Sequence, residues 1–162
     1  MEQQEITIID ALPLLREVLN VSGFTKMIGK NPGWFNNKEE EKTPFDRMAP
    51  GFTADNVELI NYGLEKVVDA CKKHKLHLPS SCPQRDIYNT YVKTELKELR
   101  KLVSMVYLRE NYTDIPTSSW NKKLNNFPNR GTVAQFTEDD IEQINNAMDK
   151  IAELISSLKV TL

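Results

Sequence analysis

The sequence predicts an all-α protein built from two related helical units in tandem, and three observations support this. Residues 52–66 read FTADNVELINYGLEK and residues 136–150 read FTEDDIEQINNAMDK, with the same residue at seven of fifteen positions and an offset of 84. Apolar residues recur at helical rather than strand spacing along most of the chain. Each copy of the repeat also begins with a helix-capping pattern. The simplest origin of such a pattern is internal duplication.

The composition is that of a soluble globular protein without targeting segments. The 162 residues are 40% hydrophobic and 27% charged, with a net charge of −2. No apolar run approaches the length of a membrane span, and the acidic first residues lack the basic and apolar regions of a signal peptide. Two unevenly placed cysteines do not make a disulfide framework, so we expect a reduced, cytoplasmic setting.

The first unit is expected to span residues 1–77. Leu12, Leu15, Val18 and Leu19 predict a first helix, and Gly23 to Gly29 a short second one. Asn31-Pro32 interrupts the chain before a third helix through Trp34 and Phe35. The polar stretch Glu39 to Gly51 is expected to be a loop. A strand signal at Glu5 to Ile9 is too short and isolated to predict a sheet.

A long amphipathic helix is expected to follow in each copy of the repeat. Thr53 and Thr137 stand where an N-cap hydroxyl would accept a backbone N–H. Phe52 with Val57, and Phe136 with Ile141, have the spacing of a hydrophobic staple. Both helices are predicted to run for roughly five turns.

Residues 78–85 are expected to link the two units, because this stretch is rich in proline and serine. The second unit, residues 86–162, is expected to open with a helix from about Asp86 to Tyr107. Its apolar end, Ile151 to Val160, could cover its own core or form a dimer seam.

Residues 22–42 have the pattern of a short helix, a tight turn and a second short helix, with Gly29 as the turn residue. With Phe24, Ile28 and Phe35 at core offsets, this stretch resembles the lambda-repressor-like helix-turn-helix superfamily of phage and bacterial regulators. The resemblance is loose: Thr25, Lys30 and Lys38 depart from the usual residue types. The second copy has Asp114-Ile115-Pro116 at the turn and no glycine. The resemblance implies two helix-turn-helix-like units that bind DNA and regulate transcription, as in proteins of phages and mobile elements.

Amides and lysines follow the aromatic residue of each unit, where a recognition helix would present them. Asparagine can pair with adenine, and lysine can contact guanine or phosphate. Glu39 to Glu41 count against this interpretation, and a solvated polar face is the alternative. The tryptophans and Phe35 are more simply core anchors. The predicted DNA-binding residues are Lys30, Asn36, Asn37, Lys38, Lys42, Asn121, Lys122, Lys123, Asn126 and Arg130.

All cysteines and histidines of the chain lie within twelve residues, at Cys71, His74, His77 and Cys82. Two thiolates and two imidazoles would satisfy tetrahedral zinc. However, positions 71, 74 and 77 cannot share one face of a regular helix, and three lysines are interleaved. Coincidence is the default, so no metal or cofactor is expected.

Charge is unevenly distributed: residues 71–106 sum to +5 and residues 136–162 to −4. The basic stretch could follow a phosphate backbone between two recognition helices, or could be a solvated helix face. No catalytic motif is present, so we expect a non-enzymatic protein. Its expected partner is double-stranded DNA, and neither a membrane nor a small-molecule substrate is expected. The alternative is a protein-interaction or structural module, whose acidic face would be Asp139, Asp140, Glu142 and Glu153.

Overall fold

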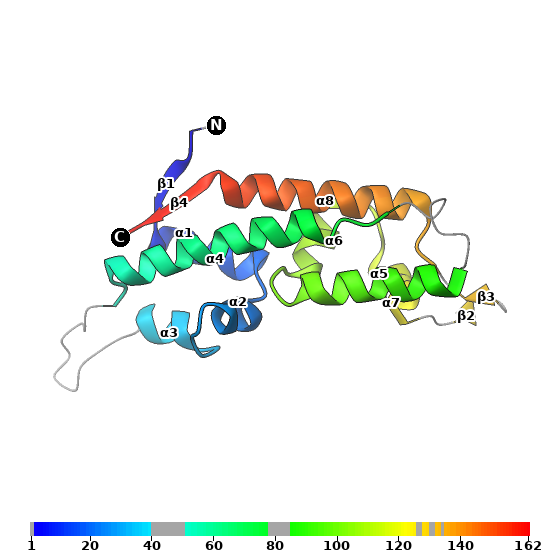
Figure 1. Ribbon diagram of the computed structural model, residues 1–162, viewed down its shortest axis with the longest axis horizontal. Coiled ribbons are helices and arrows are strands. Elements are labelled where there is room, and N and C mark those ends of the chain that lie inside the picture. The colour runs from blue at the N-terminus through cyan, green and yellow to red at the C-terminus, as the bar shows by residue number, and fades with distance from the viewer. Residues whose placement is uncertain (1, 40–50, 78–84, 126–127, 130–131, 134) are drawn as a thin grey trace.

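The computed structural model describes residues 2–39, 51–77, 85–125, 128–129, 132–133 and 135–162, and it is mostly helical. The described residues form eight helices and two small two-stranded sheets (Figure 1). The helices are α1 Ile8–Val18, α2 Val21–Met27, α3 Trp34–Glu39, α4 Ala54–Lys73, α5 Arg85–Arg100, α6 Met105–Tyr112, α7 Thr117–Asn125 and α8 Glu138–Ser156. The strands are β1 Gln4–Thr7, β2 Pro128–Asn129, β3 Thr132–Val133 and β4 Leu158–Thr161. Within these residues, no helix combines the length and the apolar character needed to cross a membrane.

The two long helices, α4 and α8, lie side by side along the molecule, and the shorter helices α2, α3, α5 and α7 lie below them in Figure 1. The predicted starts of both long helices are confirmed. Thr53 accepts a hydrogen bond from the backbone of Asn56, and Thr137 accepts one from the backbone of Asp140. In both cases the side chain of the third helical residue bonds back to the cap, which completes a capping box.

One hydrophobic core holds the described helices together. It is continuous from α1 to β4, and its fully buried members include Leu12 of α1, Ile60 of α4, Leu99 of α5 and Ile144 of α8. The aromatic anchors also behave as the sequence predicts: Trp34 packs edge-on against Phe52 in the first half, and Trp120 against Phe136 in the second. Both halves therefore contribute to the same apolar interior.

The expectation that the strand signal near the N-terminus would stay isolated is wrong. β1 pairs in parallel with β4, from Gln4 opposite Leu158 to Thr7 opposite Thr161. Its partner lies at the other end of the chain, so no local pattern could reveal the pairing. The C-terminal apolar run covers the chain's own core, which is the first of the two alternatives above. Ile151, Ile155, Leu158 and Val160 are all buried there.

The second and third helices follow the predicted pattern with a small shift. α2 begins at Val21 rather than Gly23, because the side chain of Asn20 accepts a hydrogen bond from the Gly23 N–H and caps the helix. Gly29 then takes a φ of 77°, the left-handed conformation predicted for the turn residue. Its lack of a Cβ allows the sharp passage from α2 towards α3.

The two halves meet directly where α1 ends and α6 begins. Leu19 and Val103 form an antiparallel bridge. The Asn20 N–H donates to the Leu102 carbonyl at 2.9 Å, and the Ser104 N–H donates to the Val18 carbonyl at 2.9 Å. Positions 18 and 102, and positions 20 and 104, are each 84 residues apart, so the two hydrogen bonds are equivalents of each other. This bridge lies beside an open groove, since both Leu19 and Val103 line it.

Candidate functional site

An open groove of about 630 Å³ lies over the bridge between Leu19 and Val103, and we call it the central groove. It is formed by the end of α1, the start of α2, the end of α5, the first part of α6 and one face of α7. Its lining residues are Arg16, Leu19, Asn20, Val21, Ser22, Arg100, Val103, Ser104, Met105, Val106, Arg109, Thr117, Trp120, Asn121 and Leu124.

The floor of the central groove is built from equivalent positions of the two halves. Ten of its lining residues form five pairs that are each separated by 84 positions. They are Arg16 with Arg100, Leu19 with Val103, Asn20 with Ser104, Val21 with Met105, and Ser22 with Val106. The remaining lining residues, one from α6 and four from α7, all belong to the second half.

Three arginines and no aspartate or glutamate line the central groove. The Nη2 of Arg16 donates to Asn36 Oδ1 at 2.8 Å and to Glu39 Oε2 at 2.5 Å. The side chain of Arg109 is only 11% exposed and pairs with Glu110 at 2.9 Å. Arg100 differs from both: it is exposed, and no described carboxylate lies within ion-pair distance of it. The lining of the groove therefore carries positive charge without an acidic side chain of its own.

A second, smaller groove of about 220 Å³ runs between α5 and α7, and we call it the α5–α7 groove. Lys93, Lys97 and Arg100 line it from α5, and Trp120, Leu124 and Asn125 line it from α7. It shares Arg100, Met105, Trp120 and Leu124 with the central groove, so the two are continuous. No acidic residue lines this groove either.

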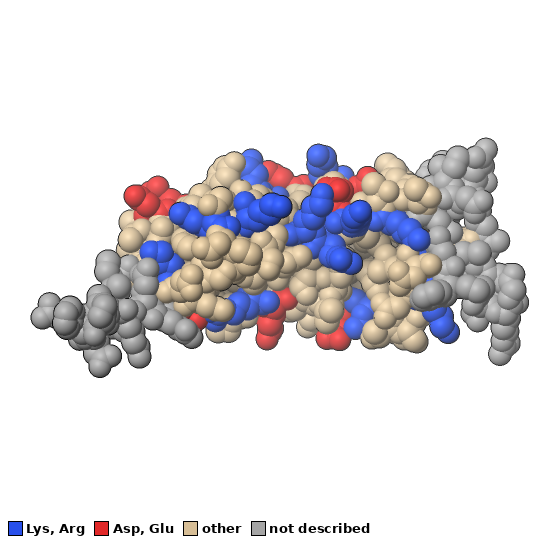
Figure 2. All heavy atoms as spheres, turned by 90° about the horizontal axis from the view of Figure 1, so that it is seen from below, with Lys and Arg blue, Asp and Glu red and all other residues tan. Residues whose placement is uncertain are grey.

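Figure 2 shows the face that lies below in Figure 1, on the side of α2, α3, α5 and α7. Lysine and arginine side chains gather there in a band that runs along much of the length of the molecule, while aspartate and glutamate lie mainly towards its edges. A surface with this distribution attracts polyanions although the net charge of the chain is −2.

The structure brings only some of the predicted DNA-binding residues to the grooves. Asn121 lines the central groove, and Asn36 reaches it indirectly through its hydrogen bond with Arg16. Asn37 and Lys122 are exposed, and Lys38 is half-buried. Lys42, Asn126 and Arg130 lie outside the described residues.

Lys30 and Lys123 each have a contact within the fold. The Lys30 ammonium lies 5.5 Å from the centre of the Trp34 ring, a cation–π contact. Lys123 pairs with Asp140 at 2.5 Å, and both side chains are largely buried, at 16% and 11% exposure. Asp140 therefore belongs to the capping box of α8 and to this pair, whereas Asp139, Glu142 and Glu153 are exposed.

The sequence interpretation missed Arg16 and Arg109 as groove residues. A signal for Arg16 was present, because Leu15-Arg16 and Leu99-Arg100 are identical dipeptides separated by the repeat offset of 84. Arg109 carried no such signal, since the equivalent position of the first half is Thr25, which is buried.

The cysteine and histidine set does not gather around one point among the described residues, where no group of three or more metal-ligating side chains is found. Cys71 is buried in the core, and burial, with a smaller contribution from Asp149, raises the pKa of its thiol to about 12. His74 Nδ1 lies 2.6 Å from Glu95 Oε2, and the His77 ring stacks on Tyr91. Cys82 lies outside the described residues.

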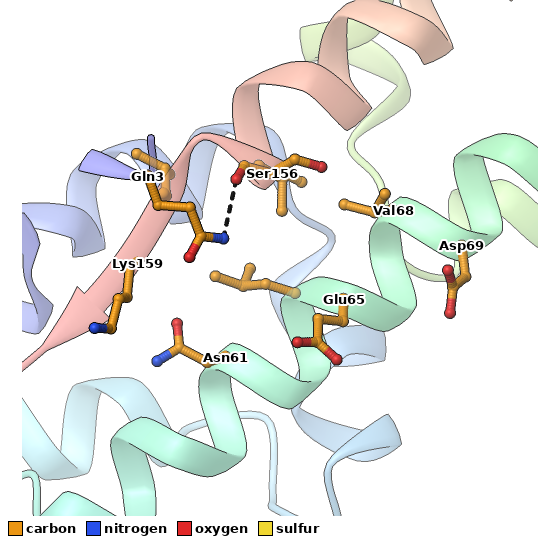
Figure 3. A pocket seen from close by; sticks show the side chains of 10 residues that line it. Gln3, Asn61, Glu65, Val68, Asp69, Ser156 and Lys159 are labelled. Carbon is orange, nitrogen blue, oxygen red and sulfur yellow. Dashed lines mark hydrogen bonds between the residues drawn. The ribbon is translucent and has the colours of Figure 1, made fainter. Parts of the chain in front are cut away.

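A third cavity, of about 460 Å³, lies between α4 and β4 (Figure 3). Asn61, Glu65 and Asp69 reach it from α4, and Lys159 lines it from β4. Gln3 closes one side by donating to the Ser156 carbonyl at 3.2 Å. Its charges are of both signs, and its lining includes none of the groove residues described above.

Comparison with known proteins finds one similarity. Residues 92–162 match the family model described as "Domain of unknown function (DUF5053)". The match begins within α5 and extends to the end of the chain, so it includes Arg100, Arg109 and Asn121 but not Arg16. No curated protein and no solved structure matches the chain. The chain is thus similar to this domain over its second half.

Proposed function

We propose that this protein is a non-enzymatic DNA-binding regulator or accessory protein that holds double-stranded DNA against its basic face. The observation that carries the proposal is the pair of continuous grooves. Lys93, Lys97 and Arg100 line the α5–α7 groove, and no carboxylate lines either groove. Arg16 and Arg109 also line the central groove, each paired with a glutamate outside its lining. Phosphate contacts of this kind supply most of the sequence-independent affinity of DNA-binding proteins.

The proposal includes an origin by internal duplication, so that one chain presents two equivalent units. The bridge between Leu19 and Val103 with its two equivalent hydrogen bonds supports this origin. So do the five residue pairs of the central groove and the capping boxes at Thr53 and Thr137, all at an offset of 84. The central groove would then lie near a local two-fold axis, the position that a repressor dimer turns towards its operator.

Each unit would use its pair of short helices in the manner of a helix-turn-helix. α2 and α3 form the first pair, and α6 and α7 the second. The second helix of each pair buries an aromatic residue and exposes amides or lysine just after it: Asn36 and Asn37 in α3, and Asn121 and Lys122 in α7. Such amides can recognise adenine edges in the major groove.

Two fused units of this kind predict a pseudo-palindromic site whose half-sites are about one helical turn, roughly 10 base pairs, apart. The chain would then do alone what a repressor does as a dimer. This distinguishes the proposal from a purely electrostatic DNA-coating protein, which would show no preferred spacing.

The proposal is tested by fluorescence anisotropy of a labelled random-sequence duplex titrated with the protein over a series of salt concentrations. We expect binding at low salt and a linear fall of log K with log salt, with a slope of about −2.7 to −4.5 if three to five phosphates are contacted. Absence of binding at the lowest salt concentration would exclude the function.

A protein-interaction module is the second candidate, and one observation favours it. Ile9, Tyr62 and Leu162 are large apolar residues that are 53%, 52% and 62% exposed. All three lie close in sequence to the β1–β4 ladder or to Asn61, which binds β4 through Val160. A contiguous patch of exposed apolar side chains would be typical of a protein-binding surface. This candidate predicts a failed DNA titration together with a protein partner whose binding is lost in Tyr62→Glu.

A further inference from the structure

Arg16 and Arg100 stand at equivalent positions of the two halves, 84 residues apart, and both line the central groove. Their surroundings differ. Arg16 is held by Asn36 and by the carboxylate of Glu39. The segment 35–38 corresponds to 120–123 at an offset of 85, so the counterpart of Asn36 is Asn121 and the counterpart of Glu39 is Leu124.

The second half therefore keeps the arginine and the amide but has lost the carboxylate. Asn121 and Leu124 line the central groove together with Arg100, although Asn36 and Glu39 themselves do not line it. No described carboxylate pairs with Arg100. The first half shows what fits such an arrangement: an anionic oxygen 2.5 Å from the guanidinium and an amide oxygen 2.8 Å from it.

We infer that Arg100, Arg109 and Asn121 form a binding site for a phosphate group, at the place that Glu39 occupies in the first half. Guanidinium groups bind carboxylates and phosphates with the same planar set of donors. The site suits a phosphate group, because Arg109, whose equivalent in the first half is Thr25, adds a second guanidinium to the lining beside its ion pair with Glu110. The Asn121 amide group can donate to a phosphate oxygen.

The phosphate can come from a DNA backbone or from a free phosphorylated compound, since both present the same anionic oxygens. The DNA source rests on the proposed function, whereas binding of phosphate as such does not. The two sources call for different arms of one experiment.

The first arm is a titration of the full chain with inorganic phosphate, followed by NMR at the Arg100 and Arg109 side chains and the Asn121 amide, with sodium chloride at equal ionic strength as the reference. Three variants accompany the wild type. Leu124→Glu restores the missing carboxylate, Leu124→Gln changes the same side chain without charge, and Asn146→Glu adds the same charge at an exposed position of α8.

We expect saturable shifts at the three groove residues in the wild type, in Leu124→Gln and in Asn146→Glu. Leu124→Glu should weaken phosphate binding at least about tenfold, because its carboxylate would occupy Arg100 as Glu39 occupies Arg16. Absence of groove shifts in the wild type would overturn the inference. Equal weakening by Leu124→Glu and Leu124→Gln would also overturn it.

The second arm adds an unlabelled duplex to the phosphate-loaded protein. Displacement of phosphate from the groove assigns the site to a DNA backbone. Phosphate that stays bound while the duplex binds, or that binds when the duplex does not, assigns it to a free phosphorylated compound. A duplex that binds to a protein showing no phosphate shifts would leave the proposed function standing and overturn the phosphate site.

Discussion

Asn61 and Asn145, which are 84 positions apart, make the same pair of hydrogen bonds to the backbone of the opposite half. Asn61 Nδ2 donates to the Val160 carbonyl at 2.9 Å, and the Val160 N–H donates to Asn61 Oδ1 at 3.0 Å. Asn145 makes the equivalent bonds to Leu76, at 2.7 and 2.8 Å. Leu76 and Val160 are themselves 84 positions apart. The identical asparagine of the repeat thus ties each long helix to the segment that follows the other.

This relationship predicts that each of the two asparagines contributes to stability. In Asn145→Ala, both backbone groups of the buried Leu76 lose their partner, which should lower the free energy of unfolding by about 2 kcal/mol. Urea denaturation followed by circular dichroism measures the difference. Asn146→Ala, at the exposed next position of α8, is the control and should change little. An Asn145→Ala protein as stable as this control would contradict the structural role.

Gly23 is predicted to tolerate no side chain. A Cβ at this position would lie 1.6 Å from the Lys101 carbonyl oxygen, so α2 packs directly on the backbone that follows α5. Gly23→Ala should destabilise the protein by about 3 kcal/mol or prevent folding, because backbone on both sides would have to shift. Gly33→Ala is the matched control, since its Cβ would be 3.6 Å from the nearest atom. Thermal unfolding of both variants compares them, and equal melting temperatures would be inconsistent with this packing.

Lys122 and Lys123 are neighbours in α7 with different predicted roles. Lys123 forms a largely buried ion pair with Asp140, so Lys123→Ala should cost about 3 kcal/mol by leaving a buried carboxylate without its cation. Lys122 is exposed, so Lys122→Ala should leave stability within about 0.5 kcal/mol and weaken DNA binding instead. Urea denaturation and anisotropy on both variants separate the two effects. A reversal of this pattern would show that the ion pair is not structural.

The buried thiol of Cys71 predicts a loss of stability at alkaline pH. Its pKa is raised from 9.0 to about 12 in the folded protein, mainly by burial. Between these values the unfolded state releases the proton while the folded state keeps it. Ionisation of this thiol therefore does not lower the free energy of unfolding below pH 9, but lowers it as the pH rises towards 12. A pKa shift of this size corresponds to a loss of at most about 4 kcal/mol in the free energy of unfolding.

The check is to compare the pH dependence of unfolding in wild type and Cys71→Ala. The free energy of unfolding should fall more steeply between pH 8 and pH 10.5 in the wild type. Only the slopes are compared, because the substitution itself removes core contacts. Parallel slopes in the two proteins would mean that the thiol ionises as readily in the folded state as in the unfolded one.

The features that the sequence predicted well are local. The caps at Thr53 and Thr137 and the left-handed Gly29 each depend on residues within a few positions, where hydrogen bonding and helix geometry decide the outcome.

Features that depend on distant parts of the chain were not predictable. The β1–β4 ladder joins positions more than 150 residues apart, and the central groove exists only because the ends of α1 and α5 meet at Leu19 and Val103. Part of the candidate site was foreseen, since Asn121 was selected directly and Arg100 belonged to the basic stretch. Lys123 turned inward because Asp140 lies at the start of α8, a contact that no spacing rule could give.

DNA binding through the α5–α7 groove is the central claim, and a pair of charge reversals tests it most directly. Lys97→Glu places a carboxylate in the groove, whereas Lys150→Glu makes the same charge change on the exposed side of α8. Anisotropy with one random-sequence duplex at low salt compares them with the wild type. We expect Lys97→Glu to weaken binding at least about tenfold and to reduce the salt slope by about 1, with Lys150→Glu within about twofold of wild type. Equal effects of the two reversals, or no binding by the wild type, would contradict the claim.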